Sequence, residues 1–396
     1  MRRRAGALLV VLWVTLSLGQ VSAQARAIKI GVLTALSGPF APWGVNVRDG
    51  MRLAATELNE AGGVAGLRVE LVERDDRNNP AEAVNAFRFL VEREGVVGAG
   101  GVISSDVGLA VAREAEALRT PWFLTMAGAH TILQRDSRYT FRTCLVAAPM
   151  NVEAIAQMVR HERLSRVGAI VADYGWGHAV RVAVERQVAS LPGVRVQIEV
   201  APVGTSDFTP YLRRLQGLDP QLLIALGHPP GTPVIVRQAA ELGMRQRIVG
   251  PWYPFELIVQ RAGEAVFGRY LDYSCADVSS PAYQGLARKF FAQYRRFFDH
   301  NALSGYAIVK LVAHAVEKVG RPDPRAVAES IRRGRFVLGG YAYPLSYTEW
   351  GELKEARPIF YSVVPGEAPG GVCPGCGWAL KYEFRSTRLR PYVPEQ

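Results

Sequence analysis

The sequence predicts an α/β protein made of two lobes, each a doubly wound parallel sheet. Short apolar strand patterns alternate with amphipathic helical patterns along most of the 396 residues, as in βαβ units. This alternation stops near residue 280, where three helical stretches follow one another, and it returns only after Gly339-Gly340. About 370 residues after a leader suit two domains rather than one. We therefore expect each lobe to be assembled from discontinuous segments, with the chain crossing between the lobes several times.

The expected elements follow from local patterns. Short apolar runs predict strands at residues 28–34, 67–73, 95–99, 121–126, 167–172, 194–200, 221–226, 247–250 and 359–364. Apolar residues at helical spacing predict helices at about 46–61, 80–94, 106–118, 150–162, 177–190, 207–217, 232–243, 281–299, 302–319 and 324–333. Gly62-Gly63 suits a helix C-cap, because glycine adopts the left-handed conformation without strain. Pro80 suits the first turn of a helix, and Pro121 suits a strand edge.

Residues 1–23 have the three parts of a secretory signal peptide. Arginines at 2–4 form the basic start, residues 7–18 are apolar, and small residues lead up to Ala23. The apolar part is shorter than the about 20 residues that a transmembrane helix needs. We expect cleavage after Ala23, with Ala25 as second choice, and no lipid anchor, because no cysteine lies near the cleavage point. The expected location is the periplasm.

The charge pattern gives no support for nucleic-acid binding. The net charge is +11 and falls to +8 once the three arginines of the leader are removed. The charges are interspersed, and no block of Lys and Arg is interleaved with aromatic residues, as a nucleic-acid site would need. We interpret the basic balance as a solvated surface.

The four cysteines are Cys144, Cys275, Cys373 and Cys376. In an oxidising compartment the Cys373-Pro374-Gly375-Cys376 run can close a small disulfide. A CxxC pair is also half of a metal site or a redox pair. No second CxxC or pair of histidines stands nearby, and the run lies in a Gly/Pro-rich C-terminal loop rather than at a strand-to-helix turn. We favour a structural disulfide between Cys373 and Cys376 and expect no metal.

Enzyme signatures are missing from the sequence. It contains no GxxxxGK[ST], HExxH or GxSxG motif, and the six histidines have no metal-ligand spacing. Asp75-Asp76 is followed by residues 77–80, Arg-Asn-Asn-Pro, which reads as a strand end and a helix cap. We therefore expect no catalytic residues and no enzyme. An exported hydrolase that uses Asp75 or Asp173 is a remote alternative.

Small and hydroxyl-bearing residues follow the expected strands of the first half. Ser37-Gly38-Pro39, with Trp43 beyond it, follows the first strand, and residues 101–105 and 125–130 follow two others. Carboxyl ends of parallel strands share one edge of a sheet, where open α/β sheets bind ligands. Free backbone N–H groups at a helix N-terminus can hold a carboxylate there, and an aromatic at the mouth of a turn can cover a small ligand.

Three strand ends of the second half bring aromatic or imidazole groups to a matching edge. They lie at residues 173–177, with Tyr174 and Trp176, at 227–230, with His228, and at 250–253, with Trp252. We interpret these strand ends as the two sides of a binding cleft rather than as a set of packed rim residues.

These elements together resemble the type I periplasmic solute-binding proteins of the branched-chain amino acid ABC importers, which include leucine-binding protein. The resemblance covers residues 28 to 365. It rests on Ile-Gly-Val-Leu-Thr-Ala-Leu-Ser-Gly-Pro at 30–39, Leu-Asn-Glu-Ala-Gly-Gly-Val at 58–64, Glu-Arg-Asp-Asp at 73–76 with Pro80, Phe-Arg-Thr at 141–143, and Arg-Gln-Ala at 237–239 before Gly243. It implies two lobes joined by a three-crossing hinge, a ligand held in the interlobe cleft, and closure that a membrane permease pair reads. A monomer is the default for the family.

The expected organisation follows from this resemblance and the helical break near residue 280. It comprises a signal peptide at 1–23, a first lobe at 24–144 and 278–335, a second lobe at 145–277 and 336–365, and a loosely ordered, Gly/Pro-rich basic tail with the CxxC at 366–396. The hinges are expected near 143–149, 274–280 and 336–344.

In the first lobe the resemblance assigns the ligand carboxylate to backbone and hydroxyl donors. Trp43 falls where an aromatic covers the ligand. Ser105, with Ser104 beside it, falls where a hydroxyl and backbone N–H groups hold the carboxylate. Met126 to Gly128, which includes Ala127, lies where the amino-acid binders place further carboxylate donors and a threonine that meets the ammonium.

In the second lobe the resemblance assigns Trp176 and His228 to aromatic or tyrosine contacts, and Tyr174 adds a further ring. Trp252 matches a position whose carboxylate pairs with the α-ammonium of an amino acid. The sequence therefore has glycine at the threonine position, Gly128, and tryptophan at the acidic one.

These two departures bear on the ligand. A buried ammonium without a carboxylate partner costs several kcal/mol. We expect a small carboxylate with an aromatic or apolar body rather than an α-amino acid. A small amide, or a cation in an aromatic cage, is an alternative.

The predicted function is that of an exported receptor without cofactor or metal. It would bind one small molecule between its lobes by hinge closure and deliver it to an ABC permease. A periplasmic sensor of the same fold, coupled to a receptor or regulator, is the alternative.

Overall fold

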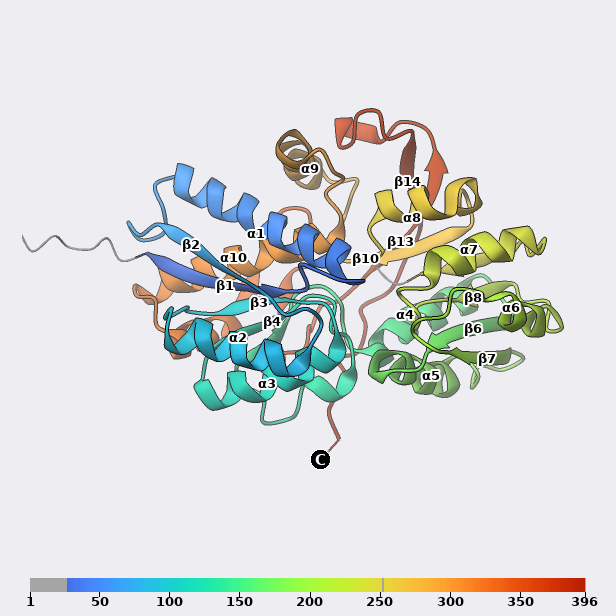
Figure 1. Ribbon diagram of the computed structural model, residues 1–396, viewed down its shortest axis with the longest axis horizontal. Helices are drawn as coiled ribbons and strands as arrows, with labels where there is room; N and C mark the ends of the chain where they lie inside the picture. Colours follow the sequence, from blue (N-terminus) through green and yellow to red (C-terminus); the bar gives the residue numbers. More distant parts are fainter. Residues whose placement is uncertain (1–26, 251–252, 396) are drawn as a thin grey trace, which may run out of the picture.

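The computed structural model describes residues 27–250 and 253–395 (Figure 1). The predicted signal peptide and Trp252 lie outside the described residues. Two sheets with their helices form two lobes, which stand on the left and the right of Figure 1. Within the described residues, no helix combines the length and the apolar character that crossing a membrane requires.

The first sheet is parallel throughout, with the strand order β2-β1-β3-β4-β5. Its strands are β1 (Ile28–Thr34), β2 (Val69–Asp75), β3 (Ala99–Val102), β4 (Trp122–Leu124) and β5 (Thr140–Arg142). Its crossover helices are α1 (Ala41–Glu60), α2 (Pro80–Glu92) and α3 (Ser105–Leu118), and a short 3-10 turn, η1 (His130–Ile132), follows β4. The order reverses between β1 and β3, and open α/β sheets bind ligands at such a switch point.

The second sheet has the order β14-β13-β10-β9-β8-β6-β7. Its parallel strands are β6 (Arg166–Ala172), β7 (Arg195–Ala201), β8 (Leu222–Ile224), β9 (Arg247–Val249) and β10 (Tyr270–Ser274). Its helices are α4 (Ala148–His161), α5 (Gly175–Gln187), α6 (Thr209–Gln216), α7 (Thr232–Glu241) and α8 (Phe255–Ala262), with the 3-10 turn η2 (Gly263–Val266). The parallel part repeats the winding of the first sheet, with its switch point between β6 and β8.

Three helices after β10 return to the first lobe: α9 (Pro281–Tyr294), α10 (His300–Val319) and α11 (Pro324–Arg333). Helix α10 packs along α1 at very short range. A Cβ added at Gly50 would lie 1.9 Å from the carbonyl oxygen of Ala302, and one at Gly305 would lie 2.0 Å from that of Val47. The two glycines therefore let the two backbones touch, and this contact ties the late helices to the first sheet.

A small two-stranded sheet follows, with β11 (Arg335–Phe336) paired to β12 (Leu345–Ser346). Residues 347–353, which the sequence predicts to belong to the second lobe, pack against the first: the backbone N–H of Arg142 in β5 donates to the carbonyl of Gly351. The chain then enters the second sheet through β13 (Ile359–Pro365), which runs antiparallel to β10.

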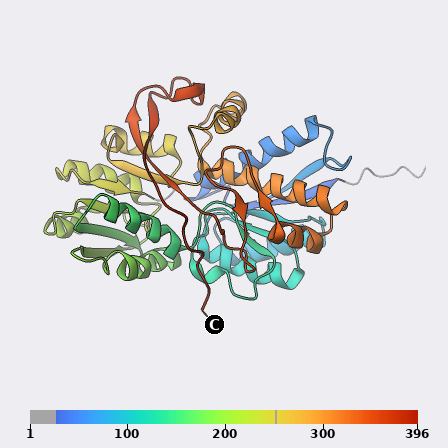
Figure 2. The same ribbon diagram turned by 180° about the vertical axis from the view of Figure 1, so that it is seen from behind.

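The C-terminal segment is more ordered than the sequence predicts. After the 3-10 turn η3 (Pro369–Gly371), β14 (Trp378–Arg385) pairs antiparallel with β13 over its whole length. The expectation of a loosely ordered tail at 366–396 is therefore wrong for this part. Its alternating aromatic and charged residues fit an edge strand, a pattern hidden behind the Gly/Pro-rich loop before it. Figure 2 shows the last residues running on between the two lobes.

The predicted fold class is confirmed: two α/β lobes with doubly wound parallel sheets, the second carrying two antiparallel edge strands. The exact lobe boundaries and the role of the crossings as hinges stay predictions.

Candidate functional site

The turn after β1 carries Trp43 to the edge of the first sheet. Asp75, at the end of the neighbouring strand β2, accepts a hydrogen bond from the backbone N–H of Leu36 at 2.9 Å and so holds this turn. Helix α1 then starts so close to the turn that a Cβ added at Gly44 would lie 1.9 Å from the carbonyl oxygen of Ala35. The indole of Trp43 is 1% exposed and meets the ring of Tyr253, beyond β9, edge to face at 4.7 Å.

The N-terminus of α3 lies at the end of β3. Ser104 is the N-cap residue, but its side chain makes no capping hydrogen bond. The first backbone N–H groups of α3 therefore receive no hydrogen bond from the N-cap side chain, and a helix N-terminus of this kind attracts anions. The hydroxyl of Ser105 accepts a hydrogen bond from the N–H of Ala129 at 3.1 Å. A hydroxyl that accepts one hydrogen bond can still donate its proton to a ligand oxygen.

A buried ion pair fixes the turn after β4. Arg142, on β5, donates Nε–H to Oε2 of Glu352 at 2.8 Å, and both side chains are at most 1% exposed. The same guanidinium donates to the carbonyls of Ala127 and Ala129. Burial raises the pKa of Glu352, while the charge of Arg142 opposes the rise. Residues 347–353 thus hold an arginine that positions the turn behind Ser105.

The second lobe contributes the turn after β6 and the start of α5. The indole Nε1–H of Trp176 donates to the carbonyl of Leu226, beyond β8, at 2.9 Å. Its ring reaches across to the first lobe, where a Cβ added at Gly128 would lie 2.4 Å from the ring atom Cζ3. Burial and the nearby charge of Asp106 raise the pKa of Tyr174, so that its hydroxyl is neutral at pH 7.

A small cavity lies between these edges. Its volume is about 20 Å³, and both lobes line it, through Phe40, Trp43, Ile103, Ser105, Met126, Leu145, Tyr174, Trp176, Leu226 and Pro229. One water needs about 10–15 Å³ measured in the same way, so this arrangement holds about one water. A benzoate-sized molecule can enter only if the lobes move apart or the rings turn. The structure is thus that of a closed cleft.

The lining is apolar and aromatic, with a few polar atoms. None of these described lining residues is an Asp, Glu, Lys, Arg or His. The acidic side chain of Asp106 lies near the start of α5 but is exposed and does not line the cavity. The side-chain hydroxyls of this described lining are those of Ser105 and Tyr174. Such a cavity suits an apolar body with one anionic or hydrogen-bonding end.

The structure brings four of the predicted ligand residues together at the cavity: Trp43, Ser105, Tyr174 and Trp176. Trp252 lies outside the described residues.

The other predicted residues lie behind the lining. Ser104 and Ala127 are buried next to it, and Gly128 leaves space for the ring of Trp176. His228 is fully buried: its Nδ1 accepts from the N–H of Gly231, and its Nε2 donates to the carbonyl of Pro202, both at 3.1 Å. Its ring thus closes the turn after β8, and both nitrogens are in use.

Three of the six remaining lining residues, Ile103, Met126 and Pro229, lie in stretches that the sequence placed at the cleft without singling them out as contacts. Sequence reasoning missed the other three as ligand contacts: Phe40, Leu145 and Leu226. All six are apolar and stand one to three residues from strand ends or turns that the sequence did indicate. Only the arrangement of the strands in space shows that these residues line the cavity. In the sequence, apolar side chains at these positions look like core residues.

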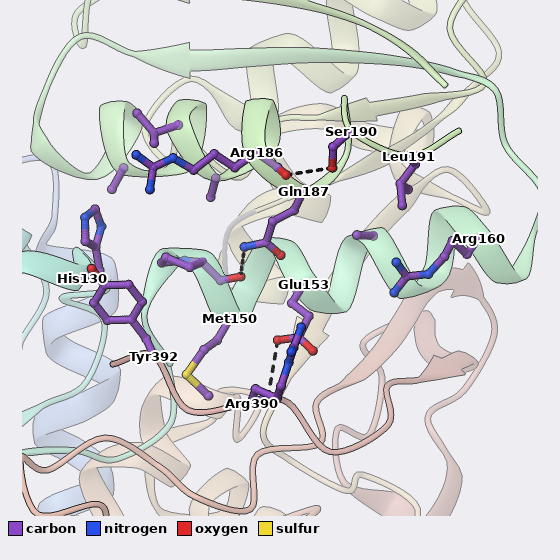
Figure 3. A pocket seen from close by; sticks show the side chains of 15 residues that line it. His130, Met150, Glu153, Arg160, Arg186, Gln187, Ser190, Leu191, Arg390 and Tyr392 are labelled. Carbon is purple, nitrogen blue, oxygen red and sulfur yellow. Dashed lines mark hydrogen bonds between the residues drawn. The ribbon is translucent and has the colours of Figure 1, made fainter. Parts of the chain in front are cut away.

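A larger cavity of about 490 Å³ lies elsewhere, between α4 and α5 (Figure 3). None of its lining residues is shared with the interlobe cavity.

Asp75 and Asp173, the carboxylates that the hydrolase alternative would use, both make structural interactions in the described part of the chain. Asp75 accepts backbone N–H groups of Leu36 and Arg77; burial alone would raise its pKa, but its hydrogen bonds, including one from Ser37, lower it. Asp173 pairs with His178 at 2.9 Å on the surface. Neither lines the interlobe cavity.

Among the described residues, one group of three potential metal ligands occurs: Glu256, Cys373 and Cys376. The two sulfurs are joined in a disulfide, which leaves one carboxylate and no metal-binding set.

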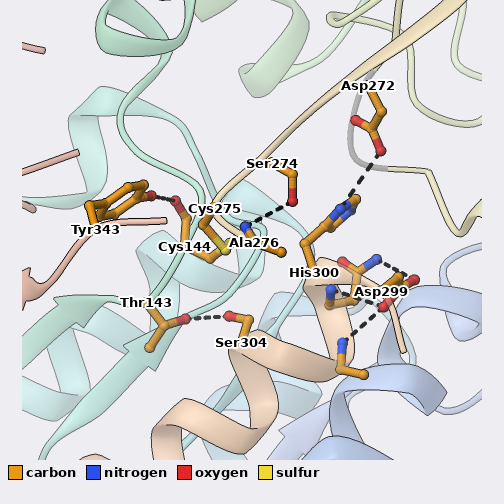
Figure 4. Close-up of a disulfide and its surroundings, with 12 residues drawn as sticks. Thr143, Cys144, Asp272, Ser274, Cys275, Ala276, Asp299, His300, Ser304 and Tyr343 are labelled. Atoms are coloured by element: carbon orange, nitrogen blue, oxygen red, sulfur yellow. Dashed lines mark hydrogen bonds and ion pairs between the residues drawn. A yellow bond between two sulfur atoms is a disulfide. The ribbon is translucent and has the colours of Figure 1, made fainter. Parts of the chain in front are cut away.

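The crossings between the lobes meet at a second disulfide, Cys144–Cys275 (Figure 4). Cys144 follows β5 of the first sheet, and Cys275 follows β10 of the second. The third crossing joins them: Tyr343 donates its hydroxyl to the carbonyl of Cys144 at 3.3 Å, and the N–H of Ala342 donates to that of Cys275 at 2.7 Å. The sequence did not indicate this pair, because its cysteines are 131 residues apart.

Comparison with known proteins agrees with this geometry. The model of a family described as periplasmic binding protein matches residues 27–351. The chain therefore belongs to the periplasmic binding protein family, and its fold is that of the leucine-binding-protein-like type I members. It is also 28% identical over 344 residues, 84% of this chain and 89% of the other, to the leucine-, isoleucine-, valine-, threonine-, and alanine-binding protein of Pseudomonas aeruginosa.

Two solved structures show the same fold. One is a branched-chain amino acid transporter substrate-binding protein from Streptococcus pneumoniae in complex with isoleucine, with 21% identity, a TM-score of 0.77, and coverage of 92% of this chain and 100% of that one. The other is a solute-binding protein of an ABC transporter from R. palustris in complex with 4-hydroxybenzoate, with 20% identity, a TM-score of 0.79, and coverage of 92% and 98%. The family is one of solute-binding proteins rather than enzymes.

Proposed function

We propose that this chain is the periplasmic substrate-binding component of an ABC importer and that it captures a small aromatic or apolar carboxylate. The observation that carries the ligand class is the cavity lining. It combines the rings of Trp43, Tyr174 and Trp176 with the hydroxyl of Ser105, and its described residues include no acid for an ammonium. Once the lobes have moved apart, a ring would lie between the tryptophans and the carboxylate would lie at the N-terminus of α3, whose N-cap side chain makes no capping hydrogen bond.

The ligands of the structural relatives support the same choice. Members of this fold hold isoleucine in one case and 4-hydroxybenzoate in another. The fold therefore accepts both amino acids and aromatic acids, and the side chains of the cleft decide between them. In this chain a buried α-ammonium has no carboxylate among the described lining, which would cost several kcal/mol. That cost favours the acid without an amino group.

The family and the closed cleft support the transport role. We infer export through the predicted signal peptide, solute capture by hinge closure between the lobes, and delivery of the closed form, as a monomer, to membrane permease subunits. No turnover of the bound solute is expected.

A thermal-shift titration tests the ligand class. Matched pairs differ only in the amino group: leucine against 4-methylpentanoate, and phenylalanine against 3-phenylpropanoate, with benzoate and 4-hydroxybenzoate as further acids. A ligand that binds the folded state stabilises it by about 2.7 kcal/mol at a hundred times its Kd. We expect the acids to raise Tm by several degrees and the amino acids to leave it unchanged. Stabilisation by the amino acids alone would overturn the ligand class while keeping the binding role.

The importer role needs its own experiment. Deleting the gene for this chain should abolish uptake of the radiolabelled acid identified by the titration, and restoring the gene should recover it. Normal uptake in the deletion strain, with binding intact in vitro, would point to a sensor instead.

A further inference from the structure

The cavity between α4 and α5 is a groove with three walls. Helices α4 and α5 form two of them, and Gln187 on α5 donates to the carbonyl of Pro149 on α4 at 2.7 Å across its middle (Figure 3). Met150, Ala156 and Ala183 are among the apolar residues that line it. Its volume of about 490 Å³ lies within the usual range of small-molecule sites, about 300–1,000 Å³.

The third wall is the C-terminal segment 386–394. It is held by regular contacts to both lobes: Leu389 N–H donates to the carbonyl of Ala356 at 2.9 Å, and the carbonyl of Pro394 accepts from Arg135 at 2.8 Å. This segment lies beyond residues 27–351, which the family model matches. The groove is thus completed by residues outside the range that the family model matches.

Three arginines line this groove: Arg160 on α4, Arg186 on α5 and Arg390 on the C-terminal segment. Their guanidinium groups make no hydrogen bond or ion pair with any other residue in the described part of the chain. Arg181, one turn earlier on α5, is paired with Glu185 in contrast. The three unpaired cations make the groove a place that favours an anion.

The carboxylates near the groove do not neutralise this charge. Glu153 is the acidic residue of the lining, and its carboxylate already accepts the backbone N–H of Arg390 at 3.4 Å. Glu395 lies near the end formed by His130 and Tyr392: burial lowers the pKa of His130 and the charge of Glu395 opposes this, whereas burial and then Glu395 raise the pKa of Tyr392. Three guanidinium groups thus face two carboxylates.

One end of the groove offers a polar atom without a partner. The Nδ1 atom of His130 is buried and has no hydrogen-bond partner among the described residues. Its ring meets that of Tyr392 edge to face at 5.1 Å. Burial, followed by the charges of Arg142 and Arg186, lowers the pKa of His130, so the ring is neutral at pH 7. A neutral ring beside an aromatic wall and an arginine suits the polar end of an aromatic anion.

We propose that this groove is a second binding site, for a small organic anion with an apolar body. The apolar floor takes the body, and the guanidinium groups of Arg186 and Arg390 take the charge. The site is separate from the interlobe cleft and does not depend on the ligand proposed there. Because its arginines are exposed, salt should weaken the binding.

Fluorescence titration of the protein without its signal peptide tests the proposal. The probe is 8-anilinonaphthalene-1-sulfonate, with the uncharged N-phenyl-1-naphthylamine as its matched control. We expect saturable one-to-one binding of the sulfonate and much weaker binding of the neutral probe. Arg186→Gln combined with Arg390→Gln should weaken binding of the sulfonate at least about tenfold.

Two further variants distinguish binding in the groove from binding at other surfaces of the protein. Arg181→Gln removes a cation from α5 outside the groove, and Ser105→Ala alters the interlobe cleft; neither should change the Kd of the sulfonate by more than about twofold. Circular dichroism and Tm show whether the double variant is folded. An unchanged Kd in the folded double variant, loss of binding in Ser105→Ala, or no saturable binding at all would overturn the proposal.

Discussion

Ser104 and Ser105 are neighbours with different surroundings. Ser105 lines the interlobe cavity and its hydroxyl accepts a hydrogen bond from the N–H of Ala129, whereas Ser104 does not line the cavity and makes no capping hydrogen bond. The sequence alone cannot separate the two, because both follow the same strand. The structure makes them a matched pair for testing which group holds the ligand.

We therefore expect Ser105→Ala to weaken binding of the acid that the thermal-shift titration identifies by about tenfold, or about 1.4 kcal/mol, through loss of one hydrogen bond to a carboxylate. Ser104→Ala should leave the Kd unchanged. Isothermal titration calorimetry at neutral pH measures both. No loss of affinity in either variant would mean that the α3 N-terminus acts through its backbone alone, and equal losses in both would contradict the separate role of Ser105.

Asp76 gives a prediction about pH. Its side chain is 1% exposed, and burial, with smaller contributions from Asp75 and Glu82, raises its pKa to about 6, although the N–H of Asn78 donates to it at 2.7 Å. The folded state therefore binds more protons than the unfolded state between about pH 4 and pH 6. The contribution of protonated Asp76 to the free energy of unfolding is therefore fully present below about pH 4 and is lost as the pH rises through about 6.

Asp76→Asn keeps an oxygen that accepts from Asn78 but cannot ionise. We expect it to stabilise the protein at pH 7 by up to about 3 kcal/mol and to change nothing at pH 4. Urea unfolding at the two pH values measures the difference. A variant that gains nothing at pH 7 would show that the carboxylate is better solvated than its burial suggests.

At the scale of elements, the turn after β4 is held in place by Arg142 on β5 and its partner Glu352, which are 210 residues apart in the sequence. Arg142 on β5 holds the carbonyls of Ala127 and Ala129, and Glu352 compensates its charge. The ends of α3 and η1 thus keep their places only if residues 347–353 return to the first lobe.

We expect Glu352→Gln to destabilise the protein by about 3 kcal/mol, because it leaves the buried guanidinium without a counter-charge. Glu349→Gln, an exposed neighbour on the same segment, is the control and should change stability little. Guanidinium chloride unfolding compares the two. If the variants are equally stable, water or another acceptor must reach Arg142.

At the scale of the whole molecule, the three crossings meet around the disulfide Cys144–Cys275 (Figure 4). A covalent tie between two crossings lets the lobes rotate about it but opposes their sliding apart. The cleft, at about 20 Å³, needs such a rotation to admit a solute. We infer that the disulfide lies near the axis of opening.

Replacing both Cys144 and Cys275 by Ser should cost about 3–5 kcal/mol, because the bond closes a loop of 131 residues in the unfolded chain. The pair Cys373 and Cys376, three residues apart, is the control, and its removal should cost clearly less. Thermal and urea unfolding measure both. Similar losses would mean that strain or packing, rather than chain entropy, sets the contribution of the crossing disulfide.

The sequence alone determined the repeated α/β winding, the helical break near residue 280, and the strand ends at which Trp43, Ser105, Tyr174 and Trp176 meet. These features are local, because apolar periodicity and turn residues act over one or two turns of chain. Where patterns were short or weak, as in β5, β10 and β14, local reading failed.

Only the tertiary structure decided which residues line the cleft and which lie behind it. His228 is hydrogen-bonded within the turn after β8, and Leu226 and Pro229 rather than His228 line the cavity. Cys144 forms a disulfide with a cysteine 131 residues away. Such choices depend on where the topology places segments that are distant in sequence. A sequence pattern describes neighbours along the chain and does not show which distant segments meet. These contacts are therefore decided by the packing of the two lobes.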